Sequence, residues 1–383
     1  MRCLNVIPGA LAIVLLLALG AIGASAAQLS TFPIPDYANS WAFGINDNGY
    51  VVGAAGRGGL GPKGYYYGAD SDHAGQWEGN IVTGVLYGKG HVTWLGSSGY
   101  YHDPSGDGYA TTFTFATGIN NAGLIAGITI YDAFDPHTGG FTGTMQSGAT
   151  AINNKGQIVG ASVGGPGGPV IGYLLDEHGQ LTDLGAYGST LPNSVNDASQ
   201  IVGTALLYDY SPSGIAFLYQ NGTFTELGSL GGGGSDALDI NNPGKIVGYS
   251  HLSNGGQHAF LYSSGVMKDL GTLGGTSSKA NAINNQGEIV GESTLADGTQ
   301  VAFLYVNGRM IDLNSFLPVG SGWTLNEAND INNFGEIVGD GTFDGRERAF
   351  ILDTTPEPAT LALIGAGAIL LGTLRKRCRR LSC

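Results

Sequence analysis

The chain has 383 residues, of which 67 are glycine and 12% are charged, and its formal net charge is −14. This composition excludes a coiled coil and a highly charged disordered chain. Six of the 16 basic residues lie in the two terminal segments, so the body is strongly acidic and lacks the basic face that nucleic-acid binding needs. The body also contains no cysteine, so burial rather than disulfides must hold it together.

The N-terminus has the features of a secretory signal. Arg2 precedes an apolar run over 11–22, which is too short to span a bilayer comfortably, and Ala24-Ser25-Ala26 forms an A-x-A cleavage site. The sequence therefore predicts a signal peptide over residues 1–26, with Ala24 and Ala26 at the cleavage site. An uncleaved anchor is the alternative.

A pattern close to Ala-x-x-Ile-Asn-Asn-x-Gly-x-Ile-Val-Gly then recurs seven times. Its apolar residue before the asparagine is Ile45, Ile119, Ile152, Val195, Ile240, Ile283 and Ile331. A period in the forties indicates an array of one supersecondary unit. The spacing is irregular only around the second copy, where a Gly- and Tyr-rich insertion follows the first copy and the next copy is short.

The copy that begins at Ala280 predicts four antiparallel strands. The expected strands are 280–284, 288–293, 301–305 and 309–313, with tight turns at Gly287 and at Asn307-Gly308. A glycine recurs inside the second strand, at positions 160, 203, 248, 291 and 339. A repeated strand glycine marks a bulge or the close approach of a neighbour.

Stacking such sheets in a circle predicts an all-β, seven-bladed β-propeller of four-stranded antiparallel blades over residues 27–353. The irregular copies leave six to eight blades open. The last copy stops after its third strand, and a strand-like segment, 28–32, precedes the first copy. We therefore expect the N-terminal strand to complete the last blade and close the ring, which removes exposed edges. An open array is the alternative.

This repeat resembles the HAF-repeat family of exported bacterial proteins. The resemblance is carried by the Ile-Asn-Asn copies, by His258-Ala259-Phe260-Leu261-Tyr262 and by Asp269-Leu270-Gly271-Thr272-Leu273-Gly274-Gly275. It covers residues 237–275 nearly throughout and most of 40–352 more weakly. That family has no established molecular function, so the resemblance implies export and repeat architecture but no chemistry.

The C-terminal segment 354–383 contains Pro356-Glu357-Pro358, an apolar stretch over 359–374 and a basic end. The basic residues, which the positive-inside rule keeps cytoplasmic, are Arg375, Lys376, Arg377, Arg379 and Arg380. The arrangement resembles the PEP-CTERM sorting signal, which implies a transmembrane helix over 359–374 and recognition by an exosortase-type processing peptidase. An ordinary tail anchor is the alternative.

Candidate chemistry in the body is sparse. The Asn pairs are interpreted as turn residues rather than a ligand ring, and His258 as a surface histidine. Asp103, Ser105 and Asp107 open a calcium-like loop, but Thr114 stands where the bidentate glutamate belongs. Tyrosines at 65–67, 100–101, 208 and 210 are candidate contacts for sugar rings. No catalytic motif is present, and no cofactor is expected apart from this weak calcium candidate.

These features predict a non-enzymatic, exported surface or matrix protein that acts as a scaffold or binding module in an exopolysaccharide layer. At least transiently, its C-terminal helix would anchor it in the inner membrane. One alternative is a polysaccharide-active enzyme with carboxylates at the channel mouth, which two carboxyl groups about 5–10 Å apart in a cleft would favour. A calcium-dependent adhesion module is the other.

Overall fold

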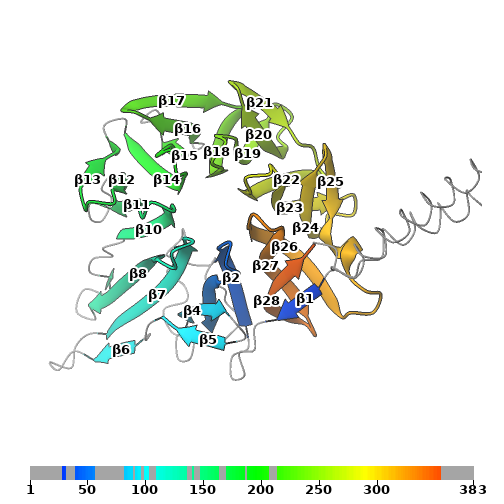
Figure 1. The fold of residues 1–383 in the computed structure, drawn as a ribbon, viewed down its shortest axis with the longest axis horizontal. Coiled ribbons are helices and arrows are strands. Elements are labelled where there is room, and N and C mark those ends of the chain that lie inside the picture. The colour runs from blue at the N-terminus through cyan, green and yellow to red at the C-terminus, as the bar shows by residue number, and fades with distance from the viewer. Residues whose placement is uncertain are drawn as a thin grey trace, which may run out of the picture.

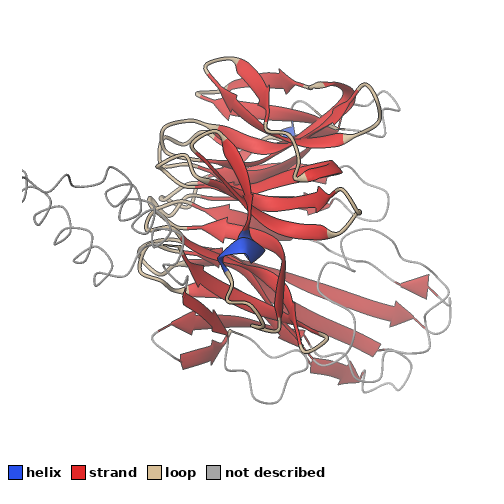
Figure 2. Cartoon of the chain, turned by 90° about the vertical axis from the view of Figure 1, so that its right-hand side faces the viewer, coloured by secondary structure: helices blue, strands red, loops and turns tan. Residues whose placement is uncertain are grey.

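A computed structural model describes residues 28–31, 39–56, 82–88, 91–95, 99–102, 109–135, 140–141, 147–163, 170–185, 188–206 and 214–354. Strands make up nearly all of this part of the chain, as Figure 2 shows, so the predicted all-β class is confirmed. Among these residues no helix is long and apolar enough to cross a membrane. The expected span 359–374, the signal peptide and the sorting motif lie outside them.

The strands follow the copies of the repeat in chain order. The first strand of each copy, here called the inner strand, faces the middle of a propeller-like ring (Figure 1). The inner strands are β2 (Asn39–Ile45), β7 (Tyr109–Ile119), β10 (Ser147–Ile152), β14 (Ser189–Val195), β18 (Gly231–Ile240), β22 (Gly274–Ile283) and β26 (Trp323–Ile331).

Each inner strand pairs antiparallel with the strand that follows its Asn turn. These second strands are β3 (Val51–Gly56), β8 (Ile125–Asp135), β11 (Ile158–Val163), β15 (Ile201–Leu206), β19 (Ile246–Leu252), β23 (Ile289–Leu295) and β27 (Glu336–Phe343). The third strands are β4 (Val82–Gly88), β9 (Gly140–Phe141), β12 (Val170–Leu175), β16 (Ile215–Gln220), β20 (Gln257–Ser263), β24 (Gln300–Val306) and β28 (Arg346–Asp353).

The outer strands and one short helix complete the fold. The outer strands are β5 (His91–Trp94), β13 (Leu181–Asp183), β17 (Thr223–Gly228), β21 (Val266–Asp269) and β25 (Arg309–Asp312), and β6 (Gly99–His102) pairs with β7. The 3₁₀ helix η4 (Leu313–Phe316) follows β25. The predicted hairpin at Asn307-Gly308 is confirmed, because both residues have positive φ.

The expected closure by the N-terminal strand is confirmed. β1 (Gln28–Thr31) pairs antiparallel with β28 over Gln28–Asp353, Leu29–Leu352 and Ser30–Ile351. The first and last strands therefore lie side by side in one sheet, in the order β1-β28-β27-β26 (Figure 1).

The hydrogen bonds group the strands into four sheets rather than seven separate ones. Two sheets have four strands, β1-β28-β27-β26 and β14–β17, and the others have eight and twelve. Short pairings join neighbouring copies within the larger sheets: β20 with β22 through Gln257–Ser277, β4 with β7 through Thr83–Thr114, and β8 with β10. The inner strands of ten or eleven residues extend far enough to meet the previous copy.

The strand glycines confirm the predicted close approach. A Cβ added to Gly248 or Gly291 would collide with the carbonyl oxygen of Asp236 or Lys279 on the inner strand. The ladder shifts register just beyond these contacts, between Ala237 and Asp239 in β18 and between Ala280 and Ala282 in β22. Glycine is needed because a bulge presses the inner strand against its partner.

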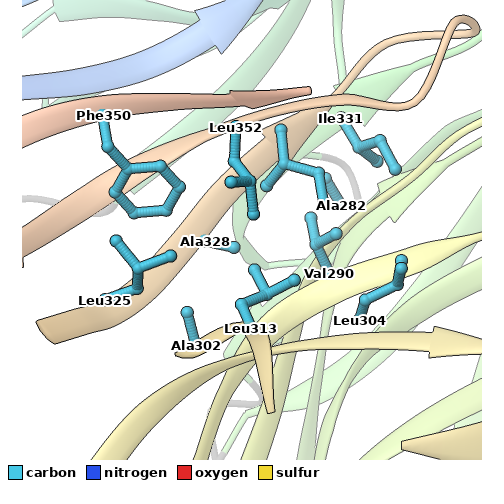
Figure 3. Close-up of a cluster of buried hydrophobic side chains, with 11 residues drawn as sticks. Ala282, Val290, Ala302, Leu304, Leu313, Leu325, Ala328, Ile331, Phe350 and Leu352 are labelled. Atoms are coloured by element: carbon cyan, nitrogen blue, oxygen red, sulfur yellow. The ribbon is translucent and has the colours of Figure 1, made fainter. Parts of the chain in front are cut away.

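The core lies between neighbouring copies. In the cluster of Figure 3, Val290, Ala302 and Leu304 of one copy pack with Leu325 and Phe350 of the next. The phenylalanine of the Ala-Phe motif is fully buried in four copies, at positions 217, 260, 303 and 350. Each contributes about 1.5–3 kcal/mol by burial, so apolar contact between copies drives the stacking.

Candidate functional site

Seven asparagines at the Asn turns form a closed ring of hydrogen bonds around the axis. They are Asn46, Asn120, Asn153, Asn196, Asn241, Asn284 and Asn332, and each is at most 5% exposed. The Nδ2 of each donates to the main-chain oxygen of the next at 2.9–3.2 Å, and Asn332 donates to Asn46 at 3.1 Å. We call this the first Asn ring. It ties every copy to the next.

The same side chains also stabilise their own turns. Asn284 Oδ1 accepts hydrogen bonds from the main-chain N–H groups of Gln286 at 3.1 Å and Glu288 at 2.9 Å. The predicted turn role is therefore confirmed. Sequence reasoning missed the second role, in which the amide nitrogen crosses to the neighbouring copy.

The following residues make a second ring, nearer solvent. They are Asp47, Asn121, Asn154, Asp197, Asn242, Asn285 and Asn333. The main-chain N–H of each donates to Oδ1 of the next at 2.9–3.0 Å, and Asn333 closes the circle onto Asp47. Burial acts to raise the pKa of Asp47, but hydrogen bonds from Asn333 and Asn121 outweigh it and lower the pKa.

Two carboxylates approach the axis from the position two residues before the first Asn ring. This channel position holds Gly44, Gly118, Ala151, Ser194, Asp239, Ala282 and Asp330. Residues of three copies meet there, because a Cβ on Gly44 would lie 3.6 Å from Gly118 Cα and 3.7 Å from Asp330 Oδ2. Small residues fill five of the seven positions, and the remaining two hold aspartates.

Both aspartates are hydrogen-bonded across a joint between copies. Asp239 accepts from Ser194 Oγ at 2.7 Å and from Ile283 N at 2.9 Å, while Asp330 accepts from Ile45 N at 2.8 Å. Burial raises the pKa of Asp239. Burial, together with the charge of Asp239, raises the pKa of Asp330 to about 7. Each carboxyl group retains the capacity to hold a proton, but main-chain donors fix its position.

A shallow cavity of about 360 Å³ opens beside the second ring. Its lining residues are Asp47, Asn48, Gly49, Phe334, Glu336 and Asp353. Phe334 is 63% exposed and gives the cavity one aromatic wall. Apart from this ring the wall is polar and rich in acceptors, which suits a ligand with hydroxyl or amine donors.

The remaining sequence candidates are not brought together. His258 Nδ1 lies 2.9 Å from both carboxylate oxygens of Asp269 on the neighbouring strand, so it forms a local pair within its own copy. Asp103, Ser105, Asp107 and the tyrosines 65–67, 208 and 210 lie outside the described residues. Within the described ranges, no group of three or more His, Cys, Asp or Glu side chains could hold a metal ion.

Comparison with solved structures finds distant similarities. An acylaminoacyl peptidase in complex with Z-Gly-Gly-Phe-chloromethyl ketone is 11% identical, with a TM-score of 0.46, over 84% of this chain and 52% of its own. The Pyrococcus horikoshii acylaminoacyl peptidase gives 11% and 0.44 over 85% and 54%. TolB from Acinetobacter baumannii gives 13% and 0.35 over 73% and 61%. The chain thus spans about half to three-fifths of their lengths.

No curated protein matches the sequence. Residues 234–350 match a family described as "Protein of unknown function (DUF3466)". Residues 354–380 match the PEP-CTERM protein-sorting motif, which implies export and sorting to the cell surface.

Proposed function

We propose that this chain is a non-enzymatic scaffold or binding module of the exopolysaccharide layer, built as a seven-bladed propeller of HAF repeats and sorted through its C-terminal segment. An exosortase-type peptidase would process the segment after Pro356-Glu357-Pro358 is recognised, with 359–374 as the membrane span. The observation that carries the proposal is the sorting-motif match at 354–380, attached to a body whose axis is made of structural hydrogen bonds.

Two features support seven blades. Both Asn rings have seven members and close on themselves, so each copy contributes one step around the axis. The pairing of β1 with β28 then supplies the fourth strand of the last copy. The short pairings that merge neighbouring copies into larger sheets involve only one or two residue pairs, as expected where adjacent blades touch.

The state of the channel carboxylates supports a non-enzymatic role. A catalytic pair needs oxygens that can reach a substrate. Here Asp239 already accepts from Ser194 and Ile283, and both oxygens of Asp330 accept main-chain N–H groups, those of Ile331 and Ile45. The open cavity beside Phe334 is better placed to contact a polymer, since it lies at the surface and presents acceptors to sugar hydroxyls.

Sorting is tested by replacing Pro356-Glu357-Pro358 with alanines in the full chain. We expect the variant to stay unprocessed in the membrane fraction, because the peptidase would have lost its recognition motif. Cell fractionation with mass measurement of the C-terminus reports this directly. Normal processing and release of the variant would contradict the proposed sorting role.

The role in the matrix is tested by mixing the full chain with exopolysaccharide purified from the same cells. We expect saturable co-sedimentation and no release of reducing ends during prolonged incubation. Steady release of reducing ends that Asp239→Asn and Asp330→Asn abolish would establish the enzymatic alternative instead. Binding that a chelator reverses and calcium restores would favour the adhesion module.

A further inference from the structure

Two of the seven joints between copies are bridged at the channel position by a carboxyl group. Asp239 of β18 reaches the main-chain nitrogen of Ile283 at the end of β22. Asp330 of β26 reaches that of Ile45 at the end of β2. The second bridge spans the joint between the last and first copies, where the ring closes. Both groups therefore act on the contacts that hold the ring together.

The charges around this pair are of one sign. After burial and the hydrogen bond from Ile45, the charge of Asp239 contributes to the raised pKa of Asp330, and the charge of Asp47 contributes in the same direction. The neighbouring strands do not supply a counter-charge to Asp330. Lys279 of β22 acts on Asp236 instead, Tyr249 of β19 also hydrogen-bonds Asp236, and Asp340 of β27 accepts from Ala42 N and Asn329 Nδ2.

Other ionisable groups on the packed strands are engaged elsewhere. Glu327 of β26 accepts from Asn281, Glu292 of β23 accepts from Gln300, and Tyr305 of β24 accepts from Lys268. Ionising both Asp239 and Asp330 thus places two negative charges near each other in a buried setting, where charge–charge repulsion is weakly screened.

We propose that Asp239 and Asp330 form a pH-responsive latch at the axis, which holds the ring most firmly when the pair carries a proton and loosens two joints when both groups are ionised. The inference concerns regulation of the fold and does not depend on the proposed function. Its direction follows from linkage. The folded-state pKa of Asp330, about 7, lies above the ordinary value of 3.8. The unfolded chain therefore releases a proton that the folded chain keeps, and stability falls as pH rises through this window.

Thermal unfolding of the full chain in mild detergent tests the latch between pH 5 and pH 8.5. For the wild type we expect a fall of about 4 °C in Tm that is attributable to this pair. Asp330→Asn should remove most of that fall, and Asp239→Asn should reduce it. Asp197→Asn is the matched control, because it removes the same charge at a second-ring position where five other copies already have asparagine. It should retain the wild-type fall.

The latch is overturned if Asp330→Asn and Asp197→Asn have the same pH dependence of Tm. If Asp330→Asn does not fold, the carboxyl carbon resonances of ¹³C-aspartate-labelled wild type decide. Two carboxyl groups that titrate well above the ordinary aspartate range support the latch, with the higher of the two midpoints shifted down in Asp239→Asn. Titration of every aspartate in the ordinary range refutes it.

Discussion

Two positions on the inner strands lie two residues apart and surround the same axis, yet they differ in kind. The first Asn ring has asparagine in all seven copies, and each one binds the next copy. The channel position has Gly, Ala, Ser or Asp, and only Ser194, Asp239 and Asp330 form side-chain bonds across a joint. The repeated position serves closure, which every joint needs, whereas the variable position is where single copies place ionisable groups.

The ring has a second closure at its rim, so the two can be separated by deleting residues 28–31. β28 would then become an exposed edge and Leu29 would be lost from the last apolar cluster. We expect a loss of about 4 kcal/mol in the free energy of unfolding, measured by urea denaturation. If closure rested on the first Asn ring alone, melting would be unchanged, and the rim would be shown to be dispensable.

The repeated position itself is tested by Asn284→Ala. This change removes the bond to Asn332 O and leaves the N–H groups of Gln286 and Glu288 without their acceptor. We expect a loss of about 3 kcal/mol, because buried groups lose their partners. Asn285→Ala, one residue later in the exposed second ring, is the matched control and should cost about 1 kcal/mol. Equal costs would mean that burial of the first ring has no special weight.

Much of this architecture could be predicted from the sequence because it is local. The Asn turn, the Asn307-Gly308 hairpin and the strand glycines each depend on residues within one copy, and the repeat shows them several times. The pairing of β1 with β28 could be predicted because the last copy lacks one strand and 28–32 supplies it. The pattern of a single copy contains all the information that these features require.

The rings and the carboxylate pair could not be predicted in the same way. The partner of Asn284 Nδ2 is a main-chain oxygen in another copy, and its identity depends on how neighbouring copies stack. Asp239 and Asp330 come from copies that are not adjacent, so no spacing in the chain relates them. The number of separate sheets failed for a similar reason, since pairs such as Gln257–Ser277 depend on how far an inner strand extends.

The smallest effect we expect comes from Ala282→Ser, which transfers a contact from one joint to another. Ser194 donates to Asp239 of the next copy at 2.7 Å, and Ala282 holds the equivalent place before Asp330. A hydroxyl there would stabilise the ionised form of Asp330 and lower its pKa. We expect a gain of about 1 kcal/mol at pH 8.5 and almost none at pH 5, measured by urea denaturation. A gain that is independent of pH would mean that the hydroxyl bonds elsewhere, and the analogy between the two joints would fail.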